Sequence, residues 1–255
     1  MKGLYLYCIR ARGANNGKIS AIPFKDIEAV VSDINPSRFN GKEITEKNIR
    51  RHHDVIAEAY QHSVVIPMKF GTIFKTRKSL EAMLKKHYRK FKRLLAELAG
   101  KQEWGVKIYL EHEKFVEFLK KENKEVKKLS AQGGPASGGE KSTMSEGMRW
   151  YADKKIEESI AAQFEEEVEN QLQVVVKRLE DCCGQVVLCD ILPKEAMEAG
   201  KDNIFNAACL VDNSKLDYFK KLLQEMRKEY DQIGATLVTT GPWPPYNFVQ
   251  LNEKN

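Results

Sequence analysis

The feature that most restricts the fold is a long helical pattern in the second half of the chain. From residue 148 to residue 181 there is no proline or glycine. About 34 residues at 1.5 Å each predict a rod on the order of 50 Å long. It is either one long core helix of a single domain or a helix that projects to meet another chain. Apolar residues recur along it, mostly in steps of four, at Ile156, Ile160, Phe164, Val168, Leu172, Val175 and Leu179.

The segments that follow this helix complete a recognisable pattern. Apolar runs at Gln185–Leu192 and Ile204–Val211 predict two strands. Ser214 is the expected N-cap of a further amphipathic helix, which Gly234 ends. Ala235–Thr239 is the expected last strand. The order helix-strand-strand-helix-strand predicts a modified ferredoxin-like domain with a lengthened first helix.

The first half of the chain also mixes strands and helices, so the fold class expected is α+β in two lobes. Proline, glycine and alternation patterns indicate strands near 4–9, 18–24, 28–34 and 104–110. Apolar residues three or four apart indicate helices at 45–60, 79–98 and 112–129.

A change of composition suggests where the two lobes meet. Residues 132–147 lose all periodicity and are rich in glycine and serine. Residues 1–129 hold 28 Lys/Arg against 15 Asp/Glu, whereas residues 130–255 hold 14 against 21. We therefore predict an N-terminal α+β domain over 1–130, a linker over 131–146 and a C-terminal ferredoxin-like domain over 147–255.

The basic first half supports several interpretations. A basic surface can bind nucleic acid, attract an acidic lobe or neighbouring copy, or simply be solvated. The helix at 79–98 carries Lys86, Arg89 and Lys90 on its polar face, which are candidate interaction residues. Its aromatic residues Tyr88 and Phe91 lie on the apolar stripe instead, where they cannot stack on bases. A nucleic-acid-binding adaptor is thus the alternative function, and no nucleic-acid partner is the favoured expectation.

Patterns that would indicate catalysis or cofactor binding fail on spacing. Gly134 and Gly139 match a phosphate-binding loop, but Glu140 stands where its lysine belongs. His52 and His53 are adjacent on a helix, so their imidazoles diverge and cannot share a metal ion. The five cysteines form no CxxC pair. We expect no enzyme activity, no cofactor and no metal, and no apolar run is long enough for membrane insertion.

The C-terminal segment is rigid and aromatic. Three prolines surround Trp243 in the sequence Gly-Pro-Trp-Pro-Pro-Tyr-Asn-Phe, residues 241–248. One interpretation is a lid that packs Trp243 and Phe248 onto a sheet. The other is an exposed docking surface, to which Tyr246 would also contribute, since rigid rings lose little entropy on binding.

These residues also carry a resemblance. The terminal motif resembles the Gly-Pro-Trp-Pro-Pro-Tyr-x-Phe segment of the gas vesicle protein L/F family (GvpL/GvpF). Upstream, Val65–Thr72 is similar to the family's segment ending in Phe-Gly-Thr, and Glu103–Lys107 to its Glu-x-Gly-Val-Lys strand. His53–Ile56 matches a helical His-x-x-Val pattern, while Leu4–Tyr7 and Ala29–Ser32 resemble two of its strands. Similarity therefore extends over both predicted lobes.

The resemblance implies a gas vesicle accessory protein, required for vesicle assembly or present as a minor structural component. It implies a non-enzymatic protein of the gas vesicle and cytoplasm, with paired α+β domains. The implied partners are the hydrophobic shell protein A and other gas vesicle accessory proteins, with self-association as a further option. Candidate contact residues are Trp243, Tyr246 and Phe248 in the terminal turn, Phe164 on the long helix, and Lys86, Arg89 and Lys90.

Overall fold

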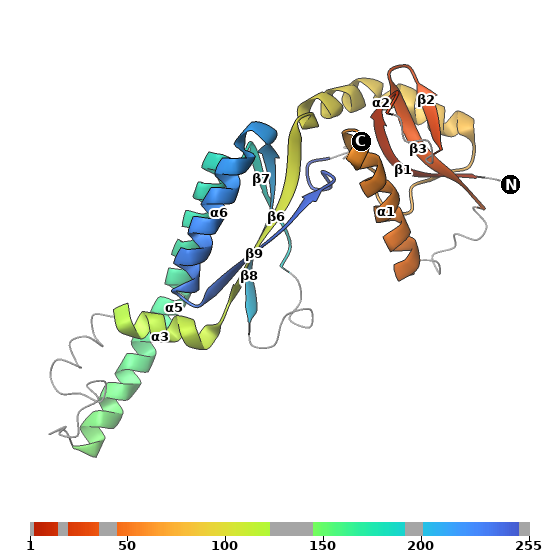
Figure 1. The fold of residues 1–255 in the computed structure, drawn as a ribbon. Helices are drawn as coiled ribbons and strands as arrows, with labels where there is room; N and C mark the ends of the chain where they lie inside the picture. Colours follow the sequence, from red (N-terminus) through yellow and green to blue (C-terminus); the bar gives the residue numbers. More distant parts are fainter. Residues whose placement is uncertain (1–2, 15–19, 36–44, 123–144, 192–200, 250–255) are drawn as a thin grey trace. The chain divides into compact units, whose positions relative to one another are not determined.

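The structure, a computed structural model, describes residues 3–14, 20–35, 45–122, 145–191 and 201–249. The chain forms two compact units and two sheets (Figure 1). Unit 1 comprises residues 1–104, 210–213 and 241–255, and unit 2 comprises residues 105–209 and 214–240. Both units combine helices with strands, which confirms the predicted α+β class.

Unit 1 is built around strand β1 (Gly3–Ala11). β1 pairs antiparallel with β3 (Ile27–Ile34), β4 (Val65–Pro67) and β5 (Ile73–Phe74). β2 (Ala21–Phe24) extends the sheet beyond β3, in the order β2-β3-β1-β4. β1 has partners on both edges, and its residues 5–10 are all buried.

A β-bulge in β1 decides which residues face which core. The pairing of β1 with β3 shifts register between Leu6 and Cys8. Tyr5, Tyr7 and Cys8 lie in one core cluster, and Leu6 and Ile9 lie in another. Strict alternation would send residues 7 and 8 to opposite faces, so the extra residue of the bulge brings both to the same side.

Two amphipathic helices cover these two clusters. Helix α1 (Glu46–His62), capped by Thr45, adds Ile56 and Ala59 to the Tyr5 cluster. Helix α2 (Arg77–Leu98) begins with a capping box between Thr76 and Ser79. It contributes to the Leu6 cluster through Leu80, Leu84, Phe91, Leu95 and Leu98. The predicted helices at 45–60 and 79–98 are thus confirmed.

The second sheet has the strand order β7-β8-β6-β9. Its strands are β6 (Lys101–Leu110), β7 (Gln185–Leu188), β8 (Asp202–Asp212) and β9 (Ala235–Trp243). Helices α3 (His112–Glu122) and α5 (Glu146–Cys182) follow β6, and α6 (Leu216–Asp231) joins β8 to β9. This β-α-β-β-α-β order is the ferredoxin-like arrangement, with α5 and α6 on one face of the sheet (Figure 1).

The position of β6 makes the units differ from the predicted domains 1–130 and 147–255. Unit 2 begins at Gly105, and the terminal segment 241–255 belongs to unit 1. Alternation identifies β6 as a strand but says nothing of its partners, which are remote in sequence. Within the predicted linker 131–146, residues 131–144 lie outside the described residues, as does the phosphate-loop-like pattern at 134–142. Ser145 caps α5 through its side chain.

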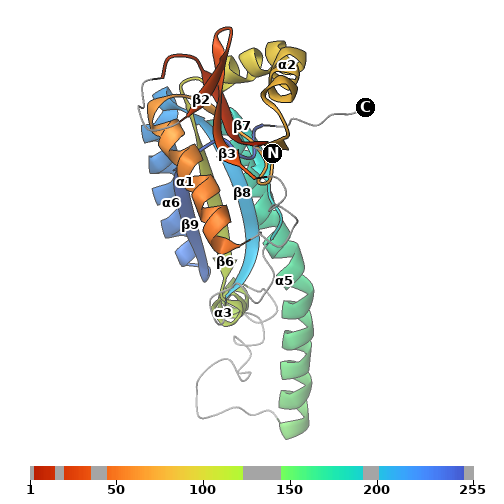
Figure 2. The same ribbon diagram turned by 90° about the vertical axis from the view of Figure 1, so that its right-hand side faces the viewer.

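Helix α5 is confirmed as a single element of 37 residues. Val175 and Leu179 are fully buried towards its C-terminal end. At its N-terminal end α5 extends past the sheet (Figure 2), and Met148, Trp150 and Tyr151 are exposed there. The C-terminal end therefore packs as a core helix does, whereas the N-terminal end projects, and its contact with another chain stays a prediction. The middle of the predicted stripe is only half-buried, at Phe164, Val168 and Leu172.

Two predictions near the C-terminus are wrong in detail. Ser214 does not cap α6, because it lies in a 3₁₀ turn (Asn213–Lys215) and the cap position is Lys215, without a side-chain hydrogen bond. Strand β9 continues to Trp243 instead of stopping at Thr239. Gly234 does follow α6 with a φ of +77°, which favours glycine there.

Candidate protein-binding groove

The buried histidine of unit 1 is held as a structural group. His52 Nε2 lies 3.1 Å from the Met68 carbonyl oxygen, and Nδ1 lies 3.0 Å from the Tyr5 hydroxyl. A carbonyl only accepts, so Nε2 carries the proton and Nδ1 accepts from Tyr5. The Tyr5 hydroxyl in turn accepts the Gly71 amide hydrogen at 3.0 Å. Burial lowers the pKa of His52 to about 4, so the ring is neutral and already engaged at both nitrogens.

A small polar pocket adjoins this histidine. Its volume is about 200 Å³, and its lining includes Tyr7, Asp33, Arg51 and His52. The prediction that one of the adjacent histidines is packed and the other solvated is confirmed, since His53 is exposed. Within the described ranges, no group of three or more His, Cys, Asp or Glu side chains could hold a metal ion.

The cysteines are free thiols, and most are buried. Burial raises the pKa of the Cys8 thiol to about 12 and that of Cys182 to about 11. Thiols of this kind are poor nucleophiles at neutral pH because little thiolate is present.

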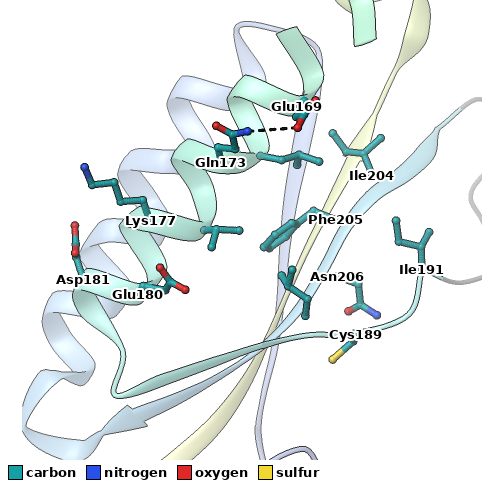
Figure 3. Close-up of a pocket in the computed structure, with 13 residues that line it drawn as sticks. Glu169, Gln173, Lys177, Glu180, Asp181, Cys189, Ile191, Ile204, Phe205 and Asn206 are labelled. Atoms are coloured by element: carbon teal, nitrogen blue, oxygen red, sulfur yellow. Dashed lines mark hydrogen bonds between the residues drawn. The ribbon is translucent and has the colours of Figure 1, made fainter. Parts of the chain in front are cut away.

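Unit 2 contains an apolar groove between α5 and the strands β7 and β8. Its volume is about 720 Å³, within the usual range for ligand sites. Leu172 and Val176 of α5 form one wall, and Figure 3 shows Phe205 pointing from β8 towards this helix. Leu188 and Ile191 lie at the strand side of the groove, with 63% and 52% of their surfaces exposed. Large apolar side chains exposed together in this way indicate a contact surface.

A second hollow of about 290 Å³ continues the groove along α5. The two share Glu169, Leu172 and Ile204. At its far end Phe164 stacks on His112, with ring centroids 4.8 Å apart, and meets Phe115 edge-on at 5.1 Å. Phe164, predicted as a contact residue, thus also secures α3 to α5.

Acidic side chains surround this apolar groove. Carboxylates line the two hollows at five positions, and Lys177 is the single lysine or arginine among the described lining residues. Figure 3 shows Lys177 and Asp181 on the side of α5 away from the strands. Gln173 donates a hydrogen bond to Glu169 at 3.4 Å. The five acidic residues are Glu165, Glu169, Glu180, Asp181 and Asp202.

The aromatic residues of the terminal turn differ in burial, so the two interpretations apply to different residues. Phe248 packs against the Leu6 cluster and Tyr246 against the Tyr5 cluster, so both serve the core of unit 1. Burial also raises the pKa of Tyr246. Trp243 is 48% exposed. The packing interpretation is therefore confirmed for Phe248, whereas Trp243 remains a candidate contact residue.

The basic face of α2 lies where the sequence predicts it. Lys86 and Arg89 are exposed and Lys90 is half-buried. Phe91 is buried in the core, and the Tyr88 hydroxyl donates a hydrogen bond to Asp26. Both aromatic residues are thus occupied within unit 1, as the apolar stripe predicts. This leaves the α2 face without rings for stacking on bases.

Sequence reasoning did not find the groove. Leu188 and Ile191 were assigned to a strand, and Leu172 to the apolar stripe of α5, but nothing local shows that they share one hollow. A usable signal was present, because the stripe of α5 contains more apolar residues than the sheet buries. Among the described helices, none has an apolar stretch long enough to span a bilayer.

Comparison with known proteins establishes the family. The family model described as gas vesicle synthesis protein GvpL/GvpF matches residues 3–250. The chain belongs to the GvpL/GvpF family. Gas vesicle protein F1 of Halobacterium salinarum is 26% identical over 242 residues, covering 92% of this chain and 83% of that protein. Gas vesicle protein L of a Streptomyces species is 23% identical over 210 residues, covering 81% and 70%.

Solved structures of GvpF proteins share the fold. The crystal structure of GvpF from an Anabaena species gives a TM-score of 0.70 at 18% identity, covering 99% of this chain and 100% of that chain. GvpF from Microcystis aeruginosa gives 0.66 at 19% identity, covering 98% and 99%. Together with the family match, which confirms the resemblance inferred from the sequence motifs, this places the chain in a gas vesicle protein family.

Within this GvpL/GvpF chain, the motif segments contact one another inside unit 1. Buried Glu103 accepts hydrogen bonds from the Asn247 amide nitrogen at 3.0 Å and from its side-chain nitrogen at 2.7 Å. His53 Nδ1 lies 2.9 Å from the Tyr246 hydroxyl. Burial raises the pKa of Glu103, although both bonds from Asn247 oppose this. The motifs thus secure the terminal segment to unit 1.

Proposed function

We propose that this protein is a gas vesicle accessory protein that binds the hydrophobic shell protein. It would act during vesicle assembly or remain as a minor component of the vesicle, in the cytoplasm. Other gas vesicle accessory proteins are further proposed partners. Family membership supports the link to gas vesicles.

The observation that carries the proposal is the open apolar groove of unit 2. Its walls expose Leu188 and Ile191, and its volume of about 720 Å³ suits apolar side chains of a partner. A very hydrophobic shell subunit would aggregate in water unless its apolar faces are covered before it enters the shell. A groove between α5 and the β7-β8 edge can cover such a face reversibly.

The proposed contact is non-covalent and involves no catalytic step. Burying a leucine-sized side chain contributes about 1.5–3 kcal/mol. Micromolar binding needs about 8 kcal/mol beyond an association cost of at least about 4 kcal/mol, so on the order of four to eight such contacts are required. Moderate affinity fits delivery, because the subunit must leave the groove when it joins the shell.

Capture of the shell protein from vesicle-forming cells tests the proposal. Tagged wild-type protein should recover the shell subunit, measured by mass spectrometry. The double variant Leu188→Asp, Ile191→Asp should reduce recovery roughly tenfold or more, since it places two charges among the apolar contacts. Both side chains are exposed, so the fold should tolerate the changes.

Val174→Asp provides the matched control. Val174 is 49% exposed on α5 and does not line the groove. This variant should recover as much shell protein as the wild type does. The proposal fails if the wild type recovers no shell subunit and cells lacking the protein still float.

A further inference from the structure

The charges around the groove restrict what can lie in it. Four of the five carboxylates, Glu165, Glu169, Glu180 and Asp181, come from α5, and Asp202 comes from β8. Lys177 is the single lysine or arginine among the described lining residues, so the fixed charge at the rim is strongly negative. A bound segment would place its own polar side chains next to these carboxylates. Opposite charge is therefore favoured in the partner and like charge is disfavoured.

The shape of the groove restricts the conformation of its occupant. The lining residues of α5 extend from Phe164 to Asp181, or roughly 26 Å at 1.5 Å per residue. The apolar surface consists of side chains on both walls, including Leu172, Val176 and Ile204. Recognition through such side chains is typical of a helix lying in a groove, whereas strand addition uses backbone groups at a sheet edge.

We infer that the groove binds an amphipathic helix whose polar face is basic. This rests on the proposed function, because it specifies the kind of partner segment that the same groove accepts. Apolar residues three or four apart would enter the groove, and lysine or arginine residues would face the carboxylates of α5. The apolar contacts supply most of the affinity, and the charges select the partner and speed its association.

Three synthetic peptides of about 18 residues test this inference. The first has leucine on one helical face and lysine on the other. The second replaces every lysine with glutamate, and the third keeps the composition of the first but shuffles the leucines around the helix. Fluorescence anisotropy with the full chain should show the first peptide binding at least roughly tenfold more tightly than either of the others.

Charge reversal on α5 tests whether the peptide binds in the groove. The variant Glu169→Lys, Glu180→Lys should weaken binding of the leucine-lysine peptide roughly tenfold and strengthen binding of the leucine-glutamate peptide. The control variant Glu157→Lys, Glu158→Lys makes the same charge change at exposed positions of α5 that do not line the groove. It should leave both affinities unchanged.

The outcomes separate the inference from the proposed function. Equal binding of the lysine and glutamate peptides, or equal effects of the two charge-reversal variants, would contradict the inference that the bound helix has a basic polar face. Equal binding of the shuffled peptide would overturn the helical geometry. If shell-protein capture is lost in the Leu188→Asp, Ile191→Asp variant but not after charge reversal, the proposed function stands without this inference. If the leucine-lysine peptide binds but no shell protein is captured, the inference about the groove stands and the proposed function fails.

Discussion

Acid should destabilise unit 1 because both ring nitrogens of His52 are already hydrogen-bonded in the neutral form of the ring. Its Nε2 hydrogen is bonded to the Met68 carbonyl, and its Nδ1 accepts from the Tyr5 hydroxyl. Protonation of Nδ1 would turn an acceptor into a donor facing another donor and would leave a buried charge. Burial accordingly lowers the pKa of His52 from 6.5 to about 4.

The size of the effect follows from these two pKa values. Between pH 6.5 and pH 4 the unfolded chain binds the proton and the folded chain does not, so stability falls as the pH falls through this range. The difference of 2.5 pKa units corresponds to about 3 kcal/mol in total and about 2 kcal/mol at pH 5. Above pH 6.5 the full contribution is present, and below pH 4 no further loss comes from this residue.

Urea unfolding from pH 4 to pH 8 measures this loss. Hydrogen exchange of residues 3–11 reports on unit 1 specifically, since β1 lies at the centre of its sheet. His52→Gln should be less stable at pH 8, by about 1–3 kcal/mol, but should lose most of the pH dependence between 6.5 and 4. Subtracting the two profiles removes contributions from other groups, such as buried Glu103.

His62→Gln is the control variant. It changes an exposed histidine of α1 and should keep the wild-type profile. If His52→Gln keeps the wild-type slope, the assignment of the acid loss to His52 is wrong.

Three further predictions concern packing and closely approaching groups. Asn247→Asp places a second carboxylate against buried Glu103, so unit 1 should lose about 2–4 kcal/mol at pH 8 and recover part of it at pH 5, measured by urea unfolding. Gly234→Ala should lower the melting temperature of unit 2, because a Cβ there would lie 2.5 Å from that of Lys114 at a φ of +77°; a change below 1 °C would contradict this. Phe164→Ala should destabilise unit 2 by about 2–3 kcal/mol in calorimetry through lost packing on the α3 rings; an unchanged transition would mean that these stacks contribute nothing.

Local sequence patterns predict the helices and strands of this fold, but they do not predict which strands pair with one another. Helix α5 was predictable because a stripe of apolar residues without proline or glycine has few other solutions. Strand β6 was recognised too, yet its place in the second sheet was missed, because pairing joins it to β8, which begins at Asp202, and to β9, which begins at Ala235. Unit 2 therefore begins at Gly105, within β6 and before the predicted linker over 131–146.

The groove was missed for a similar reason. Leu188 and Ile204 belong to different strands, and only the folded sheet places them opposite Leu172. The terminal motif shows the opposite case. Its rigidity was predictable from three prolines. The sequence did not show that Phe248 packs against the Leu6 cluster whereas Trp243 stays exposed.

Helix α5 has a double role with a measurable consequence. Val175 and Leu179 anchor unit 2, while Leu172 and Val176, on neighbouring turns, form the groove wall. A partner that binds only when this helix is in place must add RT ln(1 + [L]/Kd) to the unfolding free energy of unit 2. Titration with any true ligand would therefore raise the melting temperature of unit 2, so calorimetry could screen for the natural partner without a label.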